Sequence, residues 1–303
     1  MDRELLRSIE RTADIIRQAD AIVIGAGAGM GVDSGLPDFR GTAGFWKAYP
    51  PYARLGLDFA AMANPRWFVE DPEKAWGFYG HRLALYRRTS PHAGFDVLKG
   101  WAADAERGAF VFTSNVDGQF QRAGFDPDRV LEVHGAIDWM QCLGRCGAGI
   151  FPAELREVEI DPDTMRAVPP LPACPNCGGL ARPNILMFGD GGWNPDRTDA
   201  QLDRLNAWLA GLGGAATRGN PARRDRHRLD EWLSGPSGAR LAIVECGAGT
   251  AIPTVRRASE NFVRDAGGIL VRINPREPEV PAGQIGIAAG ALDALRAIDA
   301  WLA

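Results

Sequence analysis

Residues 25–41 read GAGAGMGVDSGLPDFRG and directly follow the apolar run 21–24. A buried strand that leads into alternating glycines lets the backbone close on a pyrophosphate, because glycine has no Cβ and accepts a positive φ. The stretch therefore predicts a dinucleotide site. Its spacing differs from the Gly-x-Gly-x-x-Gly of hydride-transferring dehydrogenases, and no acidic residue closes a second strand about 20 residues later. A redox function is therefore disfavoured.

Length, composition and charge limit the class of protein. The chain has 303 residues, 46% of them hydrophobic, which suits one large domain that carries a smaller one. It has no apolar run near the roughly 18 residues of a membrane-spanning helix, and its first residues, MDRE, lack the features of a secretory leader. We therefore expect a cytoplasmic protein with no membrane partner. The net charge of -4 argues against a general nucleic-acid surface.

Apolar runs recur along the chain and alternate with helical patterns, which is typical of a doubly wound α/β fold with a parallel sheet. Nearly every distinctive polar motif directly follows one of these runs. Because ligands of open α/β sheets bind beyond the carboxyl ends of the strands, we expect the motifs to converge on one site. The expected strands are residues 21–24, 109–113, 130–133, 184–188, 241–246 and 269–273.

Four cysteines form two closely spaced couples, Cys142 with Cys146 and Cys174 with Cys177. Two such couples are the arrangement that a tetrahedral thiolate zinc site requires. Four protein ligands leave no open position for water, so we expect a structural zinc that holds a small ribbon together. Disulfide bonds are the alternative, although nothing else in the sequence indicates an oxidising compartment. Cys246 stands alone in an apolar run and is expected to be a buried, inert thiol.

Two polar motifs follow expected strands: residues 113–124 read TSNVDGQFQRAG, and residues 130–135 read VLEVHG. Together with the glycine-rich stretch they resemble the sirtuins, which consume NAD as a reagent. That family carries Thr-Gln-Asn-Ile-Asp-Gly-Leu and Leu-His-Gly segments in this order, just before the first zinc cysteines. The resemblance implies that His134 is the catalytic base, and that Asn115 and Asp117 orient the ribose, a water and the nicotinamide.

The resemblance covers nearly the whole chain and implies further site residues. The segment RPNILMFGD at 182–190 is similar to the family's acyl-lysine channel, with Met187 and Phe188 as channel residues. By the same resemblance Phe39 shields the reactive ribose carbon, Arg40 meets the phosphates, and Asn274 meets the adenosine ribose. The residues expected at the cofactor are Gly27, Ala28, Gly29, Asp38, Phe39, Arg40, Ser114, Asn115, Asp117, Gly247, Gly249 and Asn274.

The chain departs from the family pattern at several cofactor positions. Ser114 stands where the family has glutamine, which removes an amide expected to bond the nicotinamide-side ribose. The loop at 247–250 has Ala-Gly where Thr-Ser is usual. These departures predict weaker cofactor binding or a differently tuned pocket. Residues 191–240 are longer than the corresponding family segment, and we expect a solvated insertion there.

Tyr79 and Arg82 lie three residues apart in AWGFYGHR, residues 75–82, and so share one face of an expected helix. One phenol and one guanidinium together can bind a carboxylate. The pattern resembles the Tyr-x-x-Arg element of sirtuins that remove acidic acyl groups such as succinyl and malonyl. The alternative is a core tyrosine beside an ordinary surface arginine.

The resemblance implies an NAD-dependent protein-lysine deacylase that converts NAD and an acylated lysine of a protein substrate into nicotinamide, free lysine and acyl-ADP-ribose. An ADP-ribosyltransferase or NAD glycohydrolase is the alternative, and a non-catalytic NAD-sensing module is third. The presence of His134 favours deacylation. The expected organisation is a Rossmann-like NAD-binding domain of residues 1–41, 86–135 and 183–303, a helical module of residues 42–85 and a zinc-ribbon module of residues 136–182.

Overall fold

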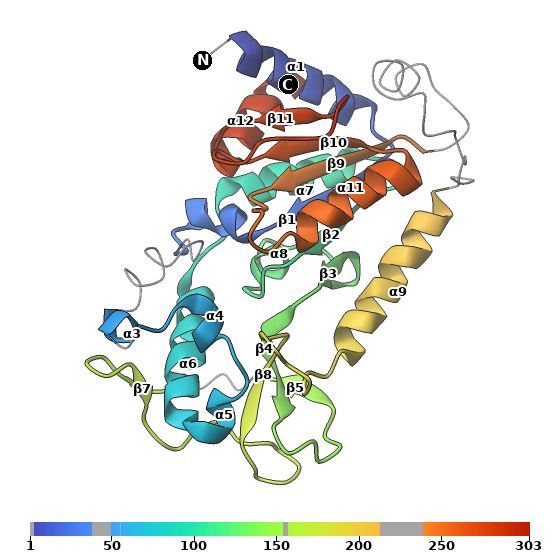
Figure 1. Ribbon diagram of the computed structural model, residues 1–303. Helices are drawn as coiled ribbons and strands as arrows, with labels where there is room; N and C mark the ends of the chain where they lie inside the picture. Colours follow the sequence, from blue (N-terminus) through green and yellow to red (C-terminus); the bar gives the residue numbers. More distant parts are fainter. Residues whose placement is uncertain (1–2, 38–49, 55, 154–156, 213–238) are drawn as a thin grey trace.

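The structure is a computed structural model that describes residues 3–37, 50–54, 56–153, 157–212 and 239–303 (Figure 1). Its centre is a six-stranded parallel sheet in the order β11-β10-β9-β1-β2-β3. The strand order runs away from β1 in both directions, so β1 and β9 flank the topological switch point, where open α/β sheets bind ligands. The strands are β1 (Ala21–Ala26), β2 (Ala109–Thr113), β3 (Val130–Glu132), β9 (Leu241–Cys246), β10 (Ile269–Ile273) and β11 (Ile285–Ile287).

Helices cover both faces of this sheet, because successive side chains of each strand point to opposite faces. Ile22 and Ile24 belong to the largest core cluster, together with residues of α1, α7 and α12. Val23 and Phe110 face the other way and pack with residues of α9 and α11. The expected doubly wound α/β fold is therefore confirmed. These helices are α1 (Arg3–Gln18), α7 (Ala93–Asp104), α9 (Asp196–Gly211), α11 (Thr254–Ala266) and α12 (Ala291–Leu302).

A second, smaller lobe lies below the sheet in Figure 1 and has its own core. It combines a group of helices with an antiparallel sheet of order β5-β4-β8 and a two-stranded hairpin of β6 and β7. Its helices are α3 (Pro50–Arg54), α4 (Phe59–Met62), α5 (Trp67–Glu70) and α6 (Pro72–Arg88). Its strands are β4 (Gly135–Cys142), β5 (Ile150–Pro152), β6 (Ile160–Asp161), β7 (Arg166–Ala167) and β8 (Ala181–Ile185).

Helix α6 is the longest element of this lobe, and the β6–β7 hairpin holds it in place. It begins where the Asp71 side chain accepts a hydrogen bond from the Lys74 backbone, with proline at its first position. Arg166 of β7 forms ion pairs with Asp71 and with Glu73. At Gly77 an added Cβ would lie 1.9 Å from the Met165 carbonyl oxygen. The hairpin therefore contacts the helix backbone directly, and glycine is needed there for this close approach.

One expected strand has a different partner. The run 184–188 was expected in the parallel sheet, but the strand is β8, and it pairs antiparallel with β4. An apolar run alone does not specify its partner, and β4 offers an edge that Ala181–Ile185 can complete even though Pro183 cannot donate to the ladder. The expectation of a parallel strand there was therefore wrong.

The remaining described elements are short; two of them come after strands of the parallel sheet, and the third leads directly into β3. They are η1 (Ala28–Ser34), α8 (Gln119–Arg122) and η2 (Pro127–Arg129). The segment 191–240 was expected to be a solvated insertion, but its helix α9 packs against the sheet through Leu205 and Trp208, so this part of the expectation was wrong. Residues 213–238 lie outside the described chain. Among the described helices, none combines the length and apolar character needed to cross a bilayer.

Candidate active site

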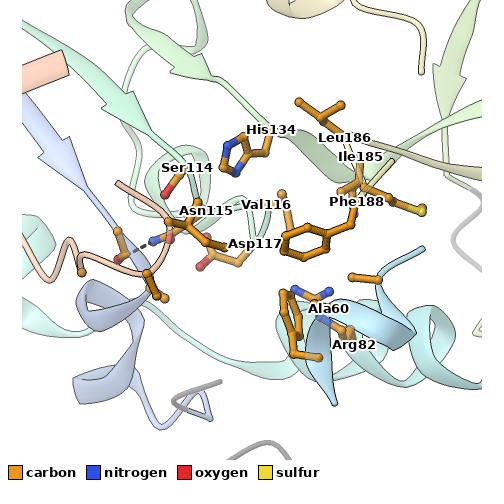
Figure 2. Close-up of a pocket in the computed structure, with 18 of the residues that line it drawn as sticks. Ala60, Arg82, Ser114, Asn115, Val116, Asp117, His134, Ile185, Leu186 and Phe188 are labelled. Atoms are coloured by element: carbon orange, nitrogen blue, oxygen red, sulfur yellow. Dashed lines mark hydrogen bonds between the residues drawn. The ribbon is translucent and has the colours of Figure 1, made fainter. Parts of the chain in front are cut away.

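A cavity of about 610 Å³ opens beyond the carboxyl ends of β1, β2, β3 and β9, at the switch point of the sheet (Figure 2). The loops after these four strands contribute Gly27 and Ala28, Ser114 to Asp117, His134, and Ala248 with Gly249. The facing wall comes from α4, α6 and the segment 185–188. The cavity therefore lies between the two lobes, and the motifs after the strands converge there as expected.

Asn115 and Asp117 lie on the strand-end side of the cavity, where backbone groups hold their side chains. The Asn115 side-chain amide donates to the Gly27 carbonyl oxygen at 3.0 Å, which links the loop after β2 to the loop after β1. The Asp117 carboxylate accepts a hydrogen bond from the Gln119 backbone at 3.0 Å. Burial raises the pKa of Asp117 above its ordinary value, although this hydrogen bond opposes the shift. Both side chains are thus fixed before any ligand enters.

His134 lies two residues after the end of β3 and faces the same cavity (Figure 2). Burial lowers the pKa of its imidazole, while a hydrogen bond to the Ser114 backbone opposes the shift. Its Nε2 atom lies 3.4 Å from the Thr254 hydroxyl oxygen. The ring is therefore biased toward its neutral form, which can accept a proton at neutral pH.

Glycines allow the loop after β1 and the loop after β9 to pack closely against each other. A Cβ on Gly27 would lie 2.6 Å from the Ala248 Cα, and one on Gly247 would lie 2.4 Å from the backbone at Gly29 and Met30. Gly247 also has a φ of 63°. The loops after β1 and β9 can therefore meet closely only because these positions carry no side chain.

Asn274 is fully buried behind these loops. Its amide donates to the Ala248 carbonyl oxygen at 2.9 Å, and its carbonyl oxygen accepts from the Arg276 and Glu277 backbones. The side chain thus fixes the loop after β9 against the loop after β10. Gly249 lines the cavity, whereas Gly29 lies behind it, with its backbone donating to the Gly247 carbonyl oxygen.

Tyr79 and Arg82 both line the cavity from α6, and both are buried, at 1% and 5% exposed. The expected helix face is therefore present, and the alternative of a surface arginine does not apply. The Tyr79 hydroxyl is buried and has no hydrogen-bond partner among the described residues. Burial raises the pKa of Tyr79, so this phenol keeps its proton. The phenol can therefore donate a hydrogen bond to a ligand in the cavity.

The segment after β8 connects the two lobes at the mouth of the cavity. The Leu186 backbone donates to the His134 carbonyl oxygen at 3.0 Å, and the Phe188 backbone donates to the Ala63 carbonyl oxygen at 2.9 Å. Met187 is buried, whereas Phe188 is 42% exposed. Both line the cavity.

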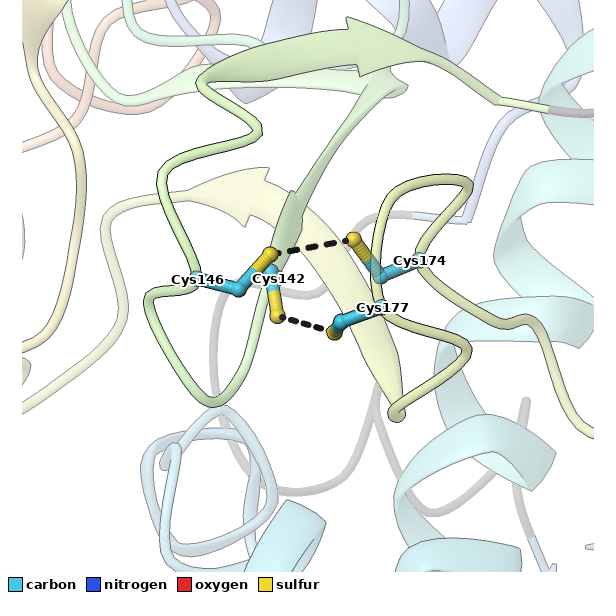
Figure 3. Close-up of side chains that lie close together, drawn as sticks. All are labelled: Cys142, Cys146, Cys174 and Cys177. Atoms are coloured by element: carbon cyan, nitrogen blue, oxygen red, sulfur yellow. Dashed lines mark hydrogen bonds between the residues drawn. The ribbon is translucent and has the colours of Figure 1, made fainter.

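The four cysteines of the two couples come together at one end of the antiparallel sheet (Figure 3). Their sulfurs all lie within 4.8 Å of one another, with Cys142 and Cys177 at 3.6 Å and Cys146 and Cys174 at 3.5 Å. A disulfide needs sulfurs about 2.05 Å apart, so the pairs are not bonded. Zinc at about 2.3 Å from each sulfur would hold the sulfurs about 3.8 Å apart. The donor set and its spacing therefore fit a tetrahedral zinc.

Three expected cofactor residues, Asp38, Phe39 and Arg40, lie outside the described residues. The sequence analysis did not identify two residues of the site. Tyr86 lines the cavity, and Thr254 lies beside His134. The i, i+4 spacing of Arg82 and Tyr86 is the signal that would have identified the first. Thr254 is brought to His134 by the packing of α11, which no local pattern reveals.

Comparison with known proteins connects the chain to one group. The family model described as "Sir2 family" matches residues 27–206. The NAD-dependent protein deacetylase of Shouchella clausii is 35% identical over 175 residues, which are 58% of this chain and 63% of that protein. The NAD-dependent protein deacylase 1 of Archaeoglobus fulgidus is 32% identical over 193 residues, 63% of this chain and 66% of that protein. The matched segments thus span slightly less than two thirds of these relatives.

Solved structures show the same architecture. A mutant Sir2 homologue in complex with ADP-ribose is similar with a TM-score of 0.66 and 25% sequence identity. The similarity covers 100% of this chain and 96% of that chain. The agreement therefore includes both the parallel sheet and the smaller lobe.

Proposed function

Because the chain belongs to the Sir2 family, we propose that it is an NAD-dependent protein-lysine deacylase. One observation carries this proposal: a single cavity joins Asn115, Asp117 and His134 at the sheet to Tyr79 and Arg82 on α6. The first group suits chemistry on a ribose, and the second suits recognition of an acyl chain. The overall reaction consumes NAD, water and an acylated lysine, and yields nicotinamide, free lysine and acyl-ADP-ribose.

The residues at the switch point fit a dinucleotide. The loops after β1 and β9 meet backbone to backbone at Gly27 and Gly247, and both border the cavity through their neighbours Ala28 and Ala248. Bound NAD would supply an electrophilic ribose carbon and nicotinamide as its leaving group. A similar Sir2 homologue is known as an ADP-ribose complex, which supports a cofactor of this kind.

The proposed roles of the sheet residues follow from their protonation and anchoring. His134, biased toward the neutral form by burial, accepts a proton from a ribose hydroxyl at a ring nitrogen. Asn115 and Asp117 orient the ribose and the nicotinamide, because backbone hydrogen bonds fix both side chains. Asp38, Phe39 and Arg40 keep their expected roles in this proposal, as do Gly29, Ser114, Gly249 and Asn274 in holding the cofactor loops.

We further propose that the preferred acyl groups are acidic, such as succinyl or malonyl. Arg82 brings a buried positive charge to the cavity, and Tyr79 brings a buried hydroxyl with no partner among the described residues. A carboxylate can accept a hydrogen bond from the Tyr79 hydroxyl and pair with the Arg82 charge, whereas the methyl group of an acetyl chain can do neither. Met187 and Phe188 border the apolar part of the same cavity, where the lysine side chain would pass.

The four cysteines are proposed to hold one structural zinc ion. Cys142 ends β4, and Cys174 and Cys177 precede β8. The metal would therefore connect the end of β4, which runs away from His134, to the start of β8, which returns to the cavity at residues 185–188. All four positions of a tetrahedral ion are filled by protein, so we assign the metal no part in the chemistry.

A panel of peptides tests the proposal. The protein is incubated with NAD and with one peptide carrying acetyl-, succinyl-, malonyl- or long-chain acyl-lysine, and the products are identified by mass spectrometry. We expect acyl-ADP-ribose and free lysine, formed fastest from the succinyl and malonyl peptides. NAD loss without any acyl peptide would instead show a glycohydrolase, and ADP-ribose attached to protein would show a transferase. NAD binding without consumption in any reaction would show a sensing module.

A further inference from the structure

Tyr86 lies one helical turn beyond Arg82 on α6 and lines the same cavity. Its hydroxyl oxygen accepts hydrogen bonds from Arg82 Nε at 3.0 Å and from Arg82 Nη2 at 2.7 Å. One oxygen therefore receives two donors from one edge of the guanidinium. Two bonds to one edge set the plane of the guanidinium as well as its position.

Aromatic rings surround the same guanidinium. The Arg82 Cζ atom lies 5.1 Å from the ring centre of Phe78, 5.3 Å from Tyr86, 5.6 Å from Phe59 and 5.8 Å from Tyr79. Cation–π attraction stabilises the charge at these distances but is tolerant of rotation. The rings thus hold the cation in the cavity wall, and the Tyr86 hydroxyl supplies the directional contact.

The Tyr86 phenol also keeps its own proton. Its oxygen accepts both Arg82 bonds, which occupies its lone pairs, and no described residue accepts a hydrogen bond from it. Burial raises the pKa of Tyr86, which is consistent with a neutral phenol. A ligand oxygen in the cavity can therefore meet two phenolic protons, from Tyr79 and Tyr86, beside the guanidinium.

We propose that Tyr86 is a positioning residue that orients Arg82 for acidic acyl groups, so that the selective element is Tyr-x-x-Arg-x-x-x-Tyr, residues 79–86. This inference rests on the proposed deacylase function and deepens it. A long arginine side chain loses much conformational freedom when it binds a ligand. Tyr86 fixes the side chain beforehand, so that less freedom is lost when a carboxylate binds.

The test replaces Tyr86 by phenylalanine, which keeps the ring and removes the hydroxyl. Steady-state rates are measured with NAD and one peptide carrying succinyl-lysine or acetyl-lysine, and calorimetry gives the Kd of each peptide. For Tyr86→Phe we expect the KM and Kd of the succinyl peptide to rise about tenfold, because a directional bond to a charged group is lost. The acetyl peptide should change less than about twofold.

Arg82→Met and the double variant show whether Tyr86 acts through Arg82. If it does, adding Tyr86→Phe to Arg82→Met causes no further loss on the succinyl peptide. Additive losses, or equal losses on both peptides, would show a general packing role and overturn the inference. A Tyr86→Phe protein that handles both peptides like the parent also overturns it.

The outcomes separate this inference from the proposed function. If no peptide is deacylated, but calorimetry shows that the parent binds the succinyl peptide and that Tyr86→Phe weakens this binding selectively, then the inference holds and the deacylase function fails. If the parent deacylates and prefers succinyl-lysine, but Tyr86→Phe changes nothing, then the function holds and the inference fails. A parent that neither binds nor deacylates the succinyl peptide contradicts this inference and the proposed acyl preference, and one that also deacylates no other acyl peptide contradicts the deacylase function.

Discussion

The two ends of the cavity are built in different ways. At the sheet, short side chains such as Asn115 and Asp117 follow the strands and are held by backbone groups of neighbouring loops. On α6, the long side chains of Arg82, Phe78 and Tyr86 contact one another within a single helix, and Phe59 of α4 lies beside the same guanidinium. Geometry at the first end is fixed by the sheet, and in the proposed function it would be the same for every acyl peptide. Geometry at the second end depends on a few side chains, which is consistent with the proposed selection of acidic acyl groups.

Zinc removal should have the largest effect, because it acts on both ends. The cysteines connect β4, which begins directly after His134, to β8, which leads to the cavity mouth. We expect about one zinc per chain, and loss of turnover on every peptide together with local unfolding when Cys174→Ser removes a ligand. Metal analysis and circular dichroism measure this. Cys246→Ala, outside the cluster, should keep the metal, and an active, metal-free Cys174→Ser protein would contradict the prediction.

His134→Ala should remove the chemistry at the sheet end of the cavity without changing the helix end. We expect a loss of about 100- to 10,000-fold on all acyl peptides with NAD binding retained, because a general base acts after the cofactor is bound. His81→Ala, on α6 and outside the cavity lining, is the matched control and should remain active. Parental turnover by His134→Ala would exclude the proposed base.

The pH profile of the parent sharpens this assignment. Burial lowers the pKa of His134, and the base must be neutral to accept a proton. The acid limb of kcat/KM should therefore have its midpoint below the ordinary histidine pKa of about 6.5. A midpoint above that value would indicate another group.

Arg82→Met should weaken recognition of the acidic acyl group at the helix end of the cavity without changing the sheet end. We expect a loss of about 10- to 100-fold in catalytic efficiency on succinyl-lysine, since a charge-assisted bond contributes about 1.5–3 kcal/mol, and little change on acetyl-lysine. The control is Arg88→Met, which removes an exposed arginine from the same helix. Equal proportional losses on the two substrates would mean that Arg82 supports only the fold of the smaller lobe.

His92→Asn should have the smallest effect, which is a change in how the melting temperature depends on pH. His92 Nε2 bonds the Met30 carbonyl oxygen at 2.9 Å, while Nδ1 accepts from the Gly94 backbone at the start of α7, so the ring is neutral. Burial lowers the pKa of His92, so the unfolded chain takes up a proton more readily. The stability from this residue is present above the ordinary pKa and is lost as the pH falls through the lowered value.

The measurement is the difference in melting temperature between pH 7.5 and pH 5.5. His92→Asn keeps a helix-capping side chain and removes the titrating group. It should reduce the loss at low pH by about 2 °C, the size expected of roughly 1 kcal/mol in a chain of this length. A pH dependence as steep as that of the parent would contradict the proposed contribution.

The sheet end was largely predictable from the sequence because its signals are local. The runs 21–24, 109–113 and 241–246 are strands, and the motifs after them meet because parallel strands end at one edge. The cysteine couples predicted their own cluster for a similar reason, since ligand spacing is a local pattern. The predicted family membership is confirmed, and the roles of the individual side chains stay predictions.

The remaining features depend on contacts between distant residues. The run 184–188 gave no sign that its strand would pair with β4, because strand partners are chosen by tertiary packing. The glycines at 25–31 suggested a pyrophosphate contact, but nothing local showed that Gly27 must accommodate the Ala248 backbone. Tyr86 is the exception, because it lies four residues from Arg82 on the same helix and that spacing is a local signal.

Gly77 gives the helix end a property that bears on its evolution. The β6–β7 hairpin lies against α6 at this glycine, on the face of the helix opposite the cavity residues Tyr79 and Arg82. A larger residue at this position must displace either the hairpin or the helix. Under the function proposed here, substitutions at Gly77 would therefore alter the placement of Tyr79 and Arg82 without touching the substrate, while the strand-end residues would stay in place.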